Sequence, residues 1–288
     1  MSLLEKITEH KKLEVGVLDA RVLRSAAEQS PAPRDFLFAI KRRRISPPVA
    51  VEGSGERSRP SLIAELKRAS PSRGILAPHL DLFQVADLYI QNGAAAISVL
   101  TDERFFMGKL ETLRALRIER HCPVPLLRKD FIIHETQLYE SRANGADAIL
   151  LIAAALTDDS LLADLHACAL SLGLTSLVEV HDETEIERAL KVEDVKLIGI
   201  NNRNLATFEV SLETTERLRP LIPPEMAVVA ESGMVIAMDV ERLSDVNVDA
   251  VLVGEALVTA EDIGAKVREL SGLRVIAGPA GSKQSPAQ

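Results

Sequence analysis

Two charged side chains at the end of a short apolar run are the first residues in this chain that suggest chemistry. The stretch LIAELKRASPSRG, residues 62–74, begins like a buried β-strand and then carries Glu65 and Lys67 before a loop rich in Ser, Pro and Gly. Side chains two positions apart on a strand face the same side, so we expect Glu65 and Lys67 to share one face while Leu66 faces the other. A carboxylate and an ammonium group at one place can act as a pair of base and acid.

Charged or amide side chains end four more apolar runs. They are Arg128, Lys129 and Asp130 in the third run of the chain, Glu179 in the fifth, Asn201, Asn202 and Arg203 in the sixth, and Glu231 and Ser232 in the seventh. Each residue taken alone fits an interior salt bridge as well as a catalytic role. The recurrence favours a common site for acid and base chemistry over a set of separate salt bridges.

Eight apolar runs of this kind recur along the chain. They are SLIAEL at 61, AAAISVL at 94, VPLLRKD at 124, DAILLIA at 147, SLVEV at 176, LIGIN at 197, MAVVAES at 226 and DAVLVG at 249. The segments between them, such as DLFQVADLYIQNG, KLETLRALRIER and HETQLYESRANG, have the spacing of helices. Two such segments end in Asn-Gly-Ala, which places a glycine where a helix end needs a positive φ. The pattern predicts an α/β fold of eight βα units.

Eight parallel strands either close into a barrel or form an open sheet. The roughly 225 residues from Leu62 onward have the usual size of a barrel, so we predict a (β/α)8 TIM barrel. Barrel enzymes carry their chemistry at the carboxyl ends of the strands. The charged ends of the runs would then meet at one rim.

Two glycines after the last two strands suggest a phosphate site. Gly233 in ESGM and Gly254 in VGEAL fall at the turns where barrels often bind phosphate through main-chain N–H groups and a helix N-terminus. Either glycine alone is weak evidence, since such turns need glycine anyway. Ser70 and Arg203 add further donors, so the sequence indicates a phosphate ester as the substrate.

The histidines and the metal-binding residue types offer no comparable pattern. His134 follows the third strand and His181 follows the fifth. We interpret both as residues at helix starts without a catalytic role. No group of His, Cys and carboxylate residues has the spacing of metal ligands, so no metal is predicted.

Composition narrows the choice of partners. Hydrophobic residues make up 47% of the chain and aromatic residues only 3%, which suits an aliphatic core of parallel strands. The net charge is −8, and the basic residues are scattered apart from KRRR at 41–44. We interpret that run as the solvated end of an N-terminal helix, so nucleic acid is not expected as a partner.

The cysteines and the apolar runs bear on the compartment. Cys122 and Cys168 form no disulfide framework, which favours a reducing interior. The longest apolar run, AILLIAAAL, is too short to cross a bilayer, and the N-terminus is charged rather than signal-like. We predict a soluble, cytoplasmic protein without a membrane partner, either a monomer or a weak homodimer.

The ends of the chain lie outside the repeat. Residues 1–60 are predicted to form an extension of one or two amphipathic helices, LEKITEHKKLEVGVL and PRDFLFAIKRRR, and a linker, SPPVAVEGSGERSRP. This extension could cover one end of the barrel. The barrel is predicted over 61–272, and residues 273–288 have the composition of a disordered tail.

The order of the motifs resembles one enzyme family. The stretches IAELKRASPSRG, SVLTDERFFMG, LLRKDFIIHETQLYESRANGADAILLI, LVEVHDETE, IGINNRNLATF, VAESGM and AVLVGEAL resemble indole-3-glycerol phosphate synthase, a barrel enzyme of tryptophan biosynthesis. The resemblance covers about residues 60–260, and the helical extension also fits that family. It implies that 1-(2-carboxyphenylamino)-1-deoxyribulose 5-phosphate closes its ring and loses carbon dioxide and water. No cofactor or metal is implied.

The resemblance also implies catalytic roles. By position in the family, Lys129 is the general acid of the condensation, and Lys67 is the acid of the dehydration or binds the substrate carboxylate. Glu179 and Glu65 are candidates for stabilising the iminium and removing the proton, a division that the resemblance leaves open. A lysine that acts as an acid near pH 7 needs a lowered pKa, which we expect a crowded cationic and partly desolvated rim to supply.

The remaining site residues are assigned from the same resemblance. Asn201, Glu231 and Ser232 would orient the polyol and the catalytic groups, the phosphate would lie on Ser70, Arg203, Gly233 and Gly254, and Phe106 and Phe131 would flank the anthranilate ring. Ordinary loop packing is the alternative for the two phenylalanines. Ala256 departs from the family, in which Ser is frequent, so one hydroxyl contact to phosphate is absent.

Two other functions compete with this interpretation. One is another phosphate-binding barrel, such as a ribulose-phosphate or phosphoribosyl isomerase or a Schiff-base lyase that uses Lys129. The order of the motifs argues against it. The other is a catalytically silent barrel that serves in binding or assembly. It predicts losses among the charged rim residues, and none is lost.

Overall fold

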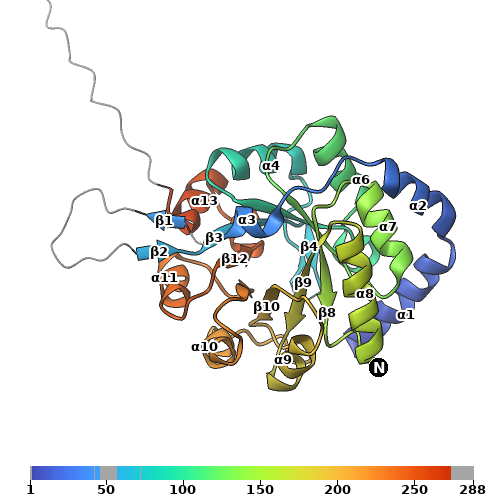
Figure 1. Cartoon of the computed structure of the whole chain (residues 1–288). Coiled ribbons are helices and arrows are strands. Elements are labelled where there is room, and N and C mark those ends of the chain that lie inside the picture. The colour runs from blue at the N-terminus through green and yellow to red at the C-terminus, as the bar shows by residue number, and fades with distance from the viewer. Residues whose placement is uncertain (1, 42, 46–56, 72, 274–288) are drawn as a thin grey trace, which may run out of the picture.

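A computed structural model describes residues 2–41, 43–45, 57–71 and 73–273 of the 288-residue chain. Eight parallel strands close into a barrel in the order β10-β11-β12-β3-β6-β7-β8-β9, and helices surround them (Figure 1). The prediction of a (β/α)8 barrel is confirmed. The strands are β3 (Ser61–Leu66), β6 (Ala96–Leu100), β7 (Leu126–Lys129), β8 (Ala148–Ile152), β9 (Thr175–Val180), β10 (Leu197–Asn201), β11 (Ala227–Glu231) and β12 (Ala250–Val253).

Alternation along each strand divides the buried apolar residues into two cores. Ile63 and Leu127 pack with other inward residues inside the barrel, whereas Leu62 and Leu66 pack in the layer between the strands and the helices. The expected facing of β3 is therefore correct, because Glu65 follows Ile63 by two positions and Leu66 faces outward. Polar residues at inward positions near the carboxyl ends can project only into the barrel mouth.

Helices follow the strands and begin at side chains that cap their first turns. Asp81, Asp158 and Asp182 each accept main-chain N–H groups at a helix start. Gly93 and Gly145, from the two Asn-Gly-Ala sequences, have φ of +101° and +84°, as predicted. The helical elements are α4 (Leu82–Gln91), α5 (Glu103–Phe106), α6 (Leu110–Arg114), the π-helix η1 (Ala115–Glu119), α7 (Glu135–Ala143), α8 (Asp159–Ser171), α9 (Glu183–Leu190), α10 (Glu213–Leu218), the 3-10 helix η2 (Arg219–Leu221), α11 (Ala237–Asp245), α12 (Glu255–Val258) and α13 (Ile263–Ser271).

The N-terminal extension differs from its prediction. It contains three helices, α1 (Leu3–Gly16), α2 (Ala20–Gln29) and α3 (Phe36–Ile40), rather than one or two. The helix expected to include the basic run stops at Ile40, and Arg43 and Arg44 lie instead in strand β1 (Arg43–Ile45), antiparallel to β2 (Arg57–Arg59). The short α3 buries its apolar pair, Phe36 and Ile40, and Lys41 then leaves the helical conformation with ψ 144°.

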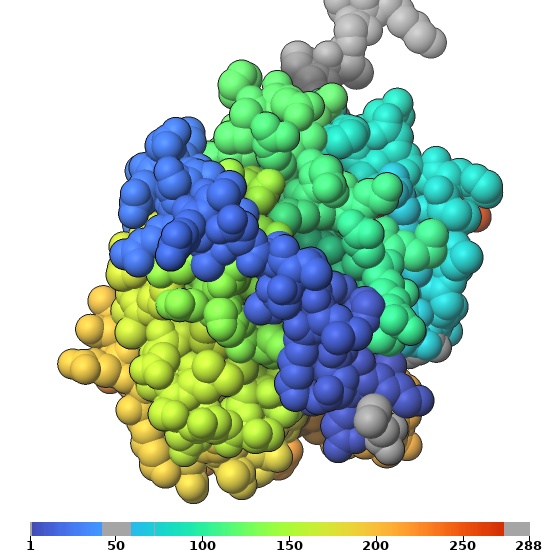
Figure 2. Space-filling model, turned by 90° about the vertical axis from the view of Figure 1, so that its right-hand side faces the viewer, coloured from blue at the N-terminus to red at the C-terminus, as the bar shows by residue number. Residues whose placement is uncertain are grey.

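The extension reaches both ends of the barrel. Phe36 and Ile40 of α3 pack against the barrel interior at the amino ends of the strands, where Ile63 and Leu127 lie. Helix α2 packs against α7 along the side, and Figure 2 shows the extension, in blue, crossing that side of the molecule. The predicted boundaries at 60 and 272 stay predictions, and residues 46–56 of the linker and 274–288 of the tail lie outside the described residues.

An ion pair anchors the extension halfway along its course. Arg34, between α2 and α3, places its Nη2 2.6 Å from Oδ2 of Asp147, which is fully buried. The same carboxylate accepts the main-chain N–H of Leu126 at the start of β7. The extension is thereby fixed to the strands whose carboxyl ends carry site residues.

Candidate active site

The carboxyl ends of the strands surround a cavity of about 730 Å³. Every residue that the sequence assigned to the site lines it, namely Glu65, Lys67, Ser70, Phe106, Lys129, Phe131, Glu179, Asn201, Arg203, Glu231, Ser232, Gly233 and Gly254. They come from seven of the eight strands or from the loops that follow them. The structure thus brings together at one rim residues that are up to 189 positions apart in sequence, from 65 to 254.

Lysine and glutamate side chains form the floor of the cavity. Lys129 Nζ lies 3.3 Å from Oε2 of Glu179 and 3.3 Å from Oε2 of Glu231. On the neighbouring side, Lys67 Nζ lies 2.8 Å from Oε1 of Glu65. The three carboxylates are almost fully buried, so their charges are screened little by solvent.

Two glycines leave space for the side chains of the buried glutamates because they have no Cβ atom. A Cβ atom on Gly199 of β10 would lie within van der Waals overlap of Oε1 of Glu231, and one on Gly254 would lie 2.5 Å from Oε1 of Glu65. A side chain at either position would displace a carboxylate. Gly254, predicted only as part of a phosphate turn, therefore also makes space for the floor.

The expected lowering of the lysine pKa is wrong. Burial alone would lower the pKa of Lys129, but the charges of Glu179, Glu231 and Glu65 outweigh it and raise that pKa above its ordinary value. The sequence placed several cations at the rim, yet carboxylates rather than cations surround this ammonium group. Lys129 is consequently protonated throughout the neutral range.

The two carboxylates beside Lys129 differ in their protonation. Burial would raise the pKa of Glu179, but the charges of Lys129 and His181 hold it well below the ordinary value. Burial and the nearby negative charge of Glu179 raise the pKa of Glu231, against the opposing charge of Lys129. Glu179 is therefore an ionised base, whereas Glu231 tends to keep its proton. Acid and base groups of this kind side by side are typical of catalytic sites.

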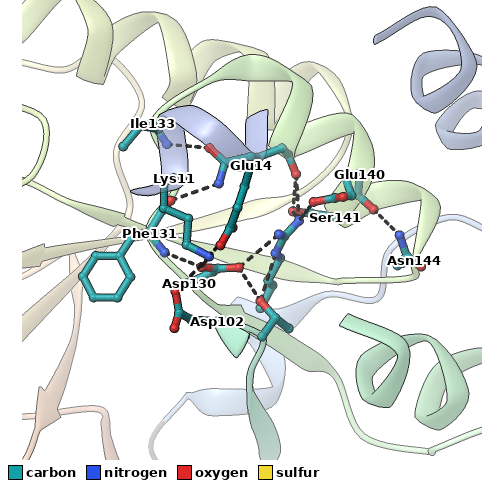
Figure 3. Close-up of polar contacts among 12 residues, drawn as sticks. Lys11, Glu14, Asp102, Asp130, Phe131, Ile133, Glu140, Ser141 and Asn144 are labelled. Carbon is teal, nitrogen blue, oxygen red and sulfur yellow. Dashed lines mark hydrogen bonds and ion pairs between the residues drawn. The ribbon is translucent and has the colours of Figure 1, made fainter. Parts of the chain in front are cut away.

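The other face of β7 carries a second ionic cluster. Lys11 of α1 is 2% exposed, and its Nζ lies 2.9 Å from Oδ1 of Asp130, 3.0 Å from Oδ2 of Asp102 and 2.7 Å from Oε2 of Glu14. Arg128 Nη2 lies 3.0 Å from the other oxygen of Asp130. Figure 3 shows Lys11 pointing between Asp102 and Asp130. The extension is thus bonded to the residue that follows Lys129.

Aromatic and aliphatic side chains form one wall of the cavity. Phe106 ends α5 and Phe131 follows β7, and their ring centroids are 6.0 Å apart. Leu3, Leu4 and Ile7 of α1 line the same cavity. Sequence reasoning missed these three residues and Lys11. One signal was available, because Lys11 follows Ile7 by four positions and so shares the buried face of α1.

The donors expected for phosphate also line the cavity. Ser70 lies in strand β4 (Ala69–Ser70), which pairs with β5 (Gly74–Ile75), and Arg203 follows β10. Ser232 and Gly233 have positive φ of 64° and 97°, so the main chain turns sharply after β11. Ala256, in α12, also lines the cavity. Its methyl group supplies no donor there.

The two histidines have different surroundings. His134 caps α7 by accepting the main-chain N–H of Thr136, as its interpretation as a helix-start residue requires. His181 precedes the cap of α9, but its ring also lies against the floor of the cavity, with Nε2 3.3 Å from Oε1 of Glu179. The interpretation of His181 as a helix-start residue alone was therefore incomplete. No sequence signal marks this contact, because it depends on the turn between β9 and α9.

The described residues contain no group of three or more His, Cys, Asp or Glu side chains arranged to hold a metal ion. Within the same residues, no helix combines the length and the apolar character needed to cross a membrane.

Fold and site together define a (β/α)8-barrel enzyme with acid and base chemistry at the carboxyl ends of its strands. The sequence model for indole-3-glycerol phosphate synthase matches residues 4–270. Proteins of that name from Roseiflexus sp. (strain RS-1) and Dehalococcoides mccartyi (strain 195) are 48% and 53% identical, over 94% and 73% of this chain and 98% and 80% of theirs. The chain belongs to the indole-3-glycerol phosphate synthase family.

Solved structures agree on the fold. A 3-hexulose-6-phosphate synthase from Salmonella typhimurium superposes with a TM-score of 0.58 at 14% identity, over 74% of this chain and 97% of its own. A mutant tryptophan synthase α-subunit from Pyrococcus furiosus gives 0.54 at 19% identity, over 74% and 98%. At such identities the likeness concerns the barrel alone.

Proposed function

We propose that this cavity converts 1-(2-carboxyphenylamino)-1-deoxyribulose 5-phosphate into indole-3-glycerol phosphate, carbon dioxide and water. Membership of the family supports this carbon–carbon lyase reaction in tryptophan biosynthesis. The observation that carries the assignment of residues is the position of Lys129, between an ionised Glu179 and a buried Glu231 on the cavity floor. An acid and a base are thus available within a few ångströms of one reacting centre.

The ring closes in the first step. The ring carbon that bears the carboxylate attacks the ketone carbon of the ribulose chain, and Lys129 gives a proton to the ketone oxygen. A C–C bond forms and leaves positive charge on the nitrogen side of the ring, which Glu179 stabilises. The carboxylate then leaves as carbon dioxide and returns its electron pair to the ring. The raised pKa of Lys129 means that the lysine enters the reaction protonated, but the surrounding carboxylates also hold that proton more tightly than an acid matched to neutral pH would hold it.

Dehydration completes the product. The hydroxyl group on the former ketone carbon takes a proton from Lys67 and leaves as water. A carboxylate removes a proton from the neighbouring carbon, which is bonded to nitrogen, and the electron pair forms the double bond between these two carbons in the five-membered ring of the indole. Glu65, 2.8 Å from Lys67 Nζ, and Glu179 are the two candidates for this base.

The ends of the cavity suit the ends of the substrate. Phe106, Phe131 and the α1 side chains offer an apolar surface to the anthranilate ring. Ser70, Arg203 and the turns at Gly233 and Gly254 face the phosphate, and Asn201 and Ser232 hold the polyol between them. A ligand held at both ends places its ketone over the lysines of the floor, which is the positional part of catalysis.

The experiment compares Lys129→Ala with the wild type in a fluorescence assay of indole formation from the carboxyphenylamino substrate. We expect kcat to fall by about 10²- to 10⁴-fold, the usual effect of losing a general acid. Lys196→Ala is the matched control, since Lys196 is exposed and lies before β10 at the other barrel end. Folding of each variant is checked by circular dichroism.

Two results would contradict the proposal. If the folded wild-type protein yielded no indole product, the proposed reaction would be wrong. If Lys129→Ala turned over within a few-fold of the wild-type rate, the assigned reaction would stand, but Lys129 could not be its general acid.

Location and assembly are further parts of the proposal. We infer that the enzyme is cytoplasmic, because Cys122 and Cys168 are free thiols, as is usual in a reducing compartment. We also infer that it is a monomer or a weak homodimer. Sedimentation of the purified protein over a range of concentrations distinguishes the two states of assembly.

A further inference from the structure

We propose that His181 is a positioning residue of the proposed reaction, a doubly protonated imidazole held between Glu185 and Glu179 that fixes the orientation and charge of the Glu179 carboxylate. The expected effects on the kinetics rest on the proposed function. The protonation of the His181 ring does not depend on that function.

The geometry places a carboxylate on each ring nitrogen. His181 Nδ1 lies 3.0 Å from Oε2 of Glu185, and Nε2 lies 3.3 Å from Oε1 of Glu179. The His181 side chain is only 13% exposed and that of Glu185 14%. The three side chains therefore form a line that runs from the first turn of α9 to the catalytic floor.

The proton count follows from the chemistry of the partners. Nδ1 is hydrogen-bonded to Glu185, and because an ionised carboxylate only accepts hydrogen bonds, Nδ1 carries a hydrogen. Nε2 makes no aligned hydrogen bond among the described residues, but it lies 3.3 Å from the ionised Glu179 carboxylate, and this ion-pair contact favours a hydrogen on Nε2 as well. A neutral imidazole has one such hydrogen, and the charged imidazolium has two. The surroundings agree, because burial would lower the pKa of His181, but hydrogen bonds and charge from Glu179 and Glu185 raise it to about 10.

Glu185 of helix α9 contacts the imidazole on the side away from Glu179. The Glu185 carboxylate accepts the main-chain N–H of His181 at 2.8 Å as well as the ring, so the backbone and the side chain share one anchor. Glu185 is fixed in turn, since its main-chain N–H donates to the capping carboxylate of Asp182 at 2.9 Å. The Glu185 carboxylate thus fixes the ring, with Nε2 3.3 Å from Oε1 of Glu179.

Glu179 gains a cation on each oxygen. Lys129 faces Oε2 and His181 faces Oε1, and the Asn201 side chain adds a hydrogen bond. The carboxylate cannot turn towards Glu231 without losing one of these cations. Loss of His181 would leave Lys129 as the single cation on Glu179 and allow the two buried glutamates to share a proton. The base would then be protonated at a higher pH than in the wild type.

The charged and titratable groups that act on the ring from the elements around it are Glu179 of β9 and Glu185 of α9. Through Glu179 the ring is linked to Lys129 of β7 and Glu231 of β11. A change at Glu185 should therefore act on catalysis through the charge of His181, although Glu185 does not line the cavity.

The test measures kcat and KM from acid to alkaline pH for the wild type, His181→Gln and Glu185→Gln. We expect His181→Gln to lower kcat roughly 10- to 100-fold with KM changed less than about 3-fold, since the base is misplaced but the substrate contacts remain. The acid limb of kcat/KM should move to higher pH. Glu185→Gln should lose activity at alkaline pH, where a less strongly held His181 gives up its proton.

His134→Asn is the matched control, because it also removes a histidine near a helix start but touches none of the floor residues. A purely stabilising His181 would lower the unfolding midpoint of His181→Gln and leave its pH profile unchanged. That outcome, or a kcat within about 2-fold of the wild type, would overturn the inference.

Nitrogen NMR of imidazole-labelled protein separates this inference from the proposed function. Two protonated nitrogens on His181 at pH 8 are expected, whatever the substrate is. One protonated nitrogen at pH 8 would overturn the inference even if the synthase reaction proceeds. A wild type without turnover, but with the doubly protonated ring, would instead overturn the function alone.

Discussion

Strand β7 separates two lysines, both surrounded by carboxylates, that differ in how many of their hydrogen-bond donors are already in use. Lys11, on the outer face, has three carboxylate oxygens within 3.0 Å and is 2% exposed. Lys129, on the inner face, has two at 3.3 Å and borders a cavity at 16% exposure. Lys11 is saturated with partners, whereas Lys129 has donors left for a ligand.

The carboxylates show the same contrast. Asp130 lies between Arg128 and Lys11, and although burial would raise its pKa, these charges lower it to about 2. Glu231 shares one lysine with a second carboxylate, so burial and repulsion raise its pKa to about 8. In the cluster around Lys11, the cations are numerous enough to keep Asp130 ionised. In the cluster around Lys129, one lysine faces two carboxylates, so one carboxylate can gain or lose a proton near neutral pH, and this property suits catalysis.

The largest expected effect on this comparison is on stability. Lys11→Met leaves Asp102 and Asp130 buried without their shared cation, so the free energy of unfolding should fall by about 3–5 kcal/mol. Lys129→Met should cost clearly less, since Glu231 tends to keep its proton and Glu179 retains His181. Urea unfolding followed by circular dichroism measures both variants. Equal losses would show that the two clusters do not differ in the way described.

A smaller effect concerns pH. Because the pKa of Glu231 is raised from an ordinary 4.5 to about 8, the folded protein binds this proton more tightly than the unfolded chain between those values. The contribution of Glu231 to stability is present below about pH 4.5 and is lost as the pH rises through about 8. Glu231→Gln should remove a slope of at most about 1.4 kcal/mol per pH unit from this window.

Urea midpoints at several pH values from 5 to 8 check this slope. Identical slopes for the wild type and Glu231→Gln would mean that Glu231 is ionised like its neighbour. Asp130 behaves in the opposite way, since its depressed pKa gives stability that is present above about pH 4 and lost as the pH falls through about 2.

The smallest expected effect lies outside both clusters. Ala256→Ser adds a hydroxyl group at the phosphate end of the cavity, and one hydrogen bond to a charged group is worth about 1.5–3 kcal/mol at most. We expect KM to fall by about 3- to 10-fold with kcat unchanged. Ala260→Ser, just beyond α12 and outside the cavity, serves as the control. A change in kcat rather than KM would connect this end of the cavity with the floor.

Most of the barrel could be predicted from the sequence because its pattern is local. Apolar runs, helix spacing and Asn-Gly-Ala ends each depend on a few neighbouring residues, and inward facing follows from alternation, as Ile63 and Glu65 show. The residue types at the rim then follow, because parallel strands bring their carboxyl ends together.

What could not be predicted depends on contacts between distant parts of the chain. Lys11 lies in the charged sequence EHKK and looks solvated until α1 is placed against Asp130. The raised pKa of Lys129 depends on how close three glutamates from other strands approach it. His181 resembles any residue before a helix cap, and only the turn after β9 shows that it faces Glu179.

The two faces of β7 carry different ionic clusters, and this difference constrains how the sequence can change in evolution. Arg128 and Lys129 end strand β7 and Asp130 follows it directly, so alternation alone places Lys129 on the inner face and its two neighbours on the outer face. Insertion or deletion of one residue within β7 would exchange the faces and place the Lys129 ammonium group outside the barrel. We therefore expect insertions and deletions among homologues to be rarer in this strand than in the loops on either side of it.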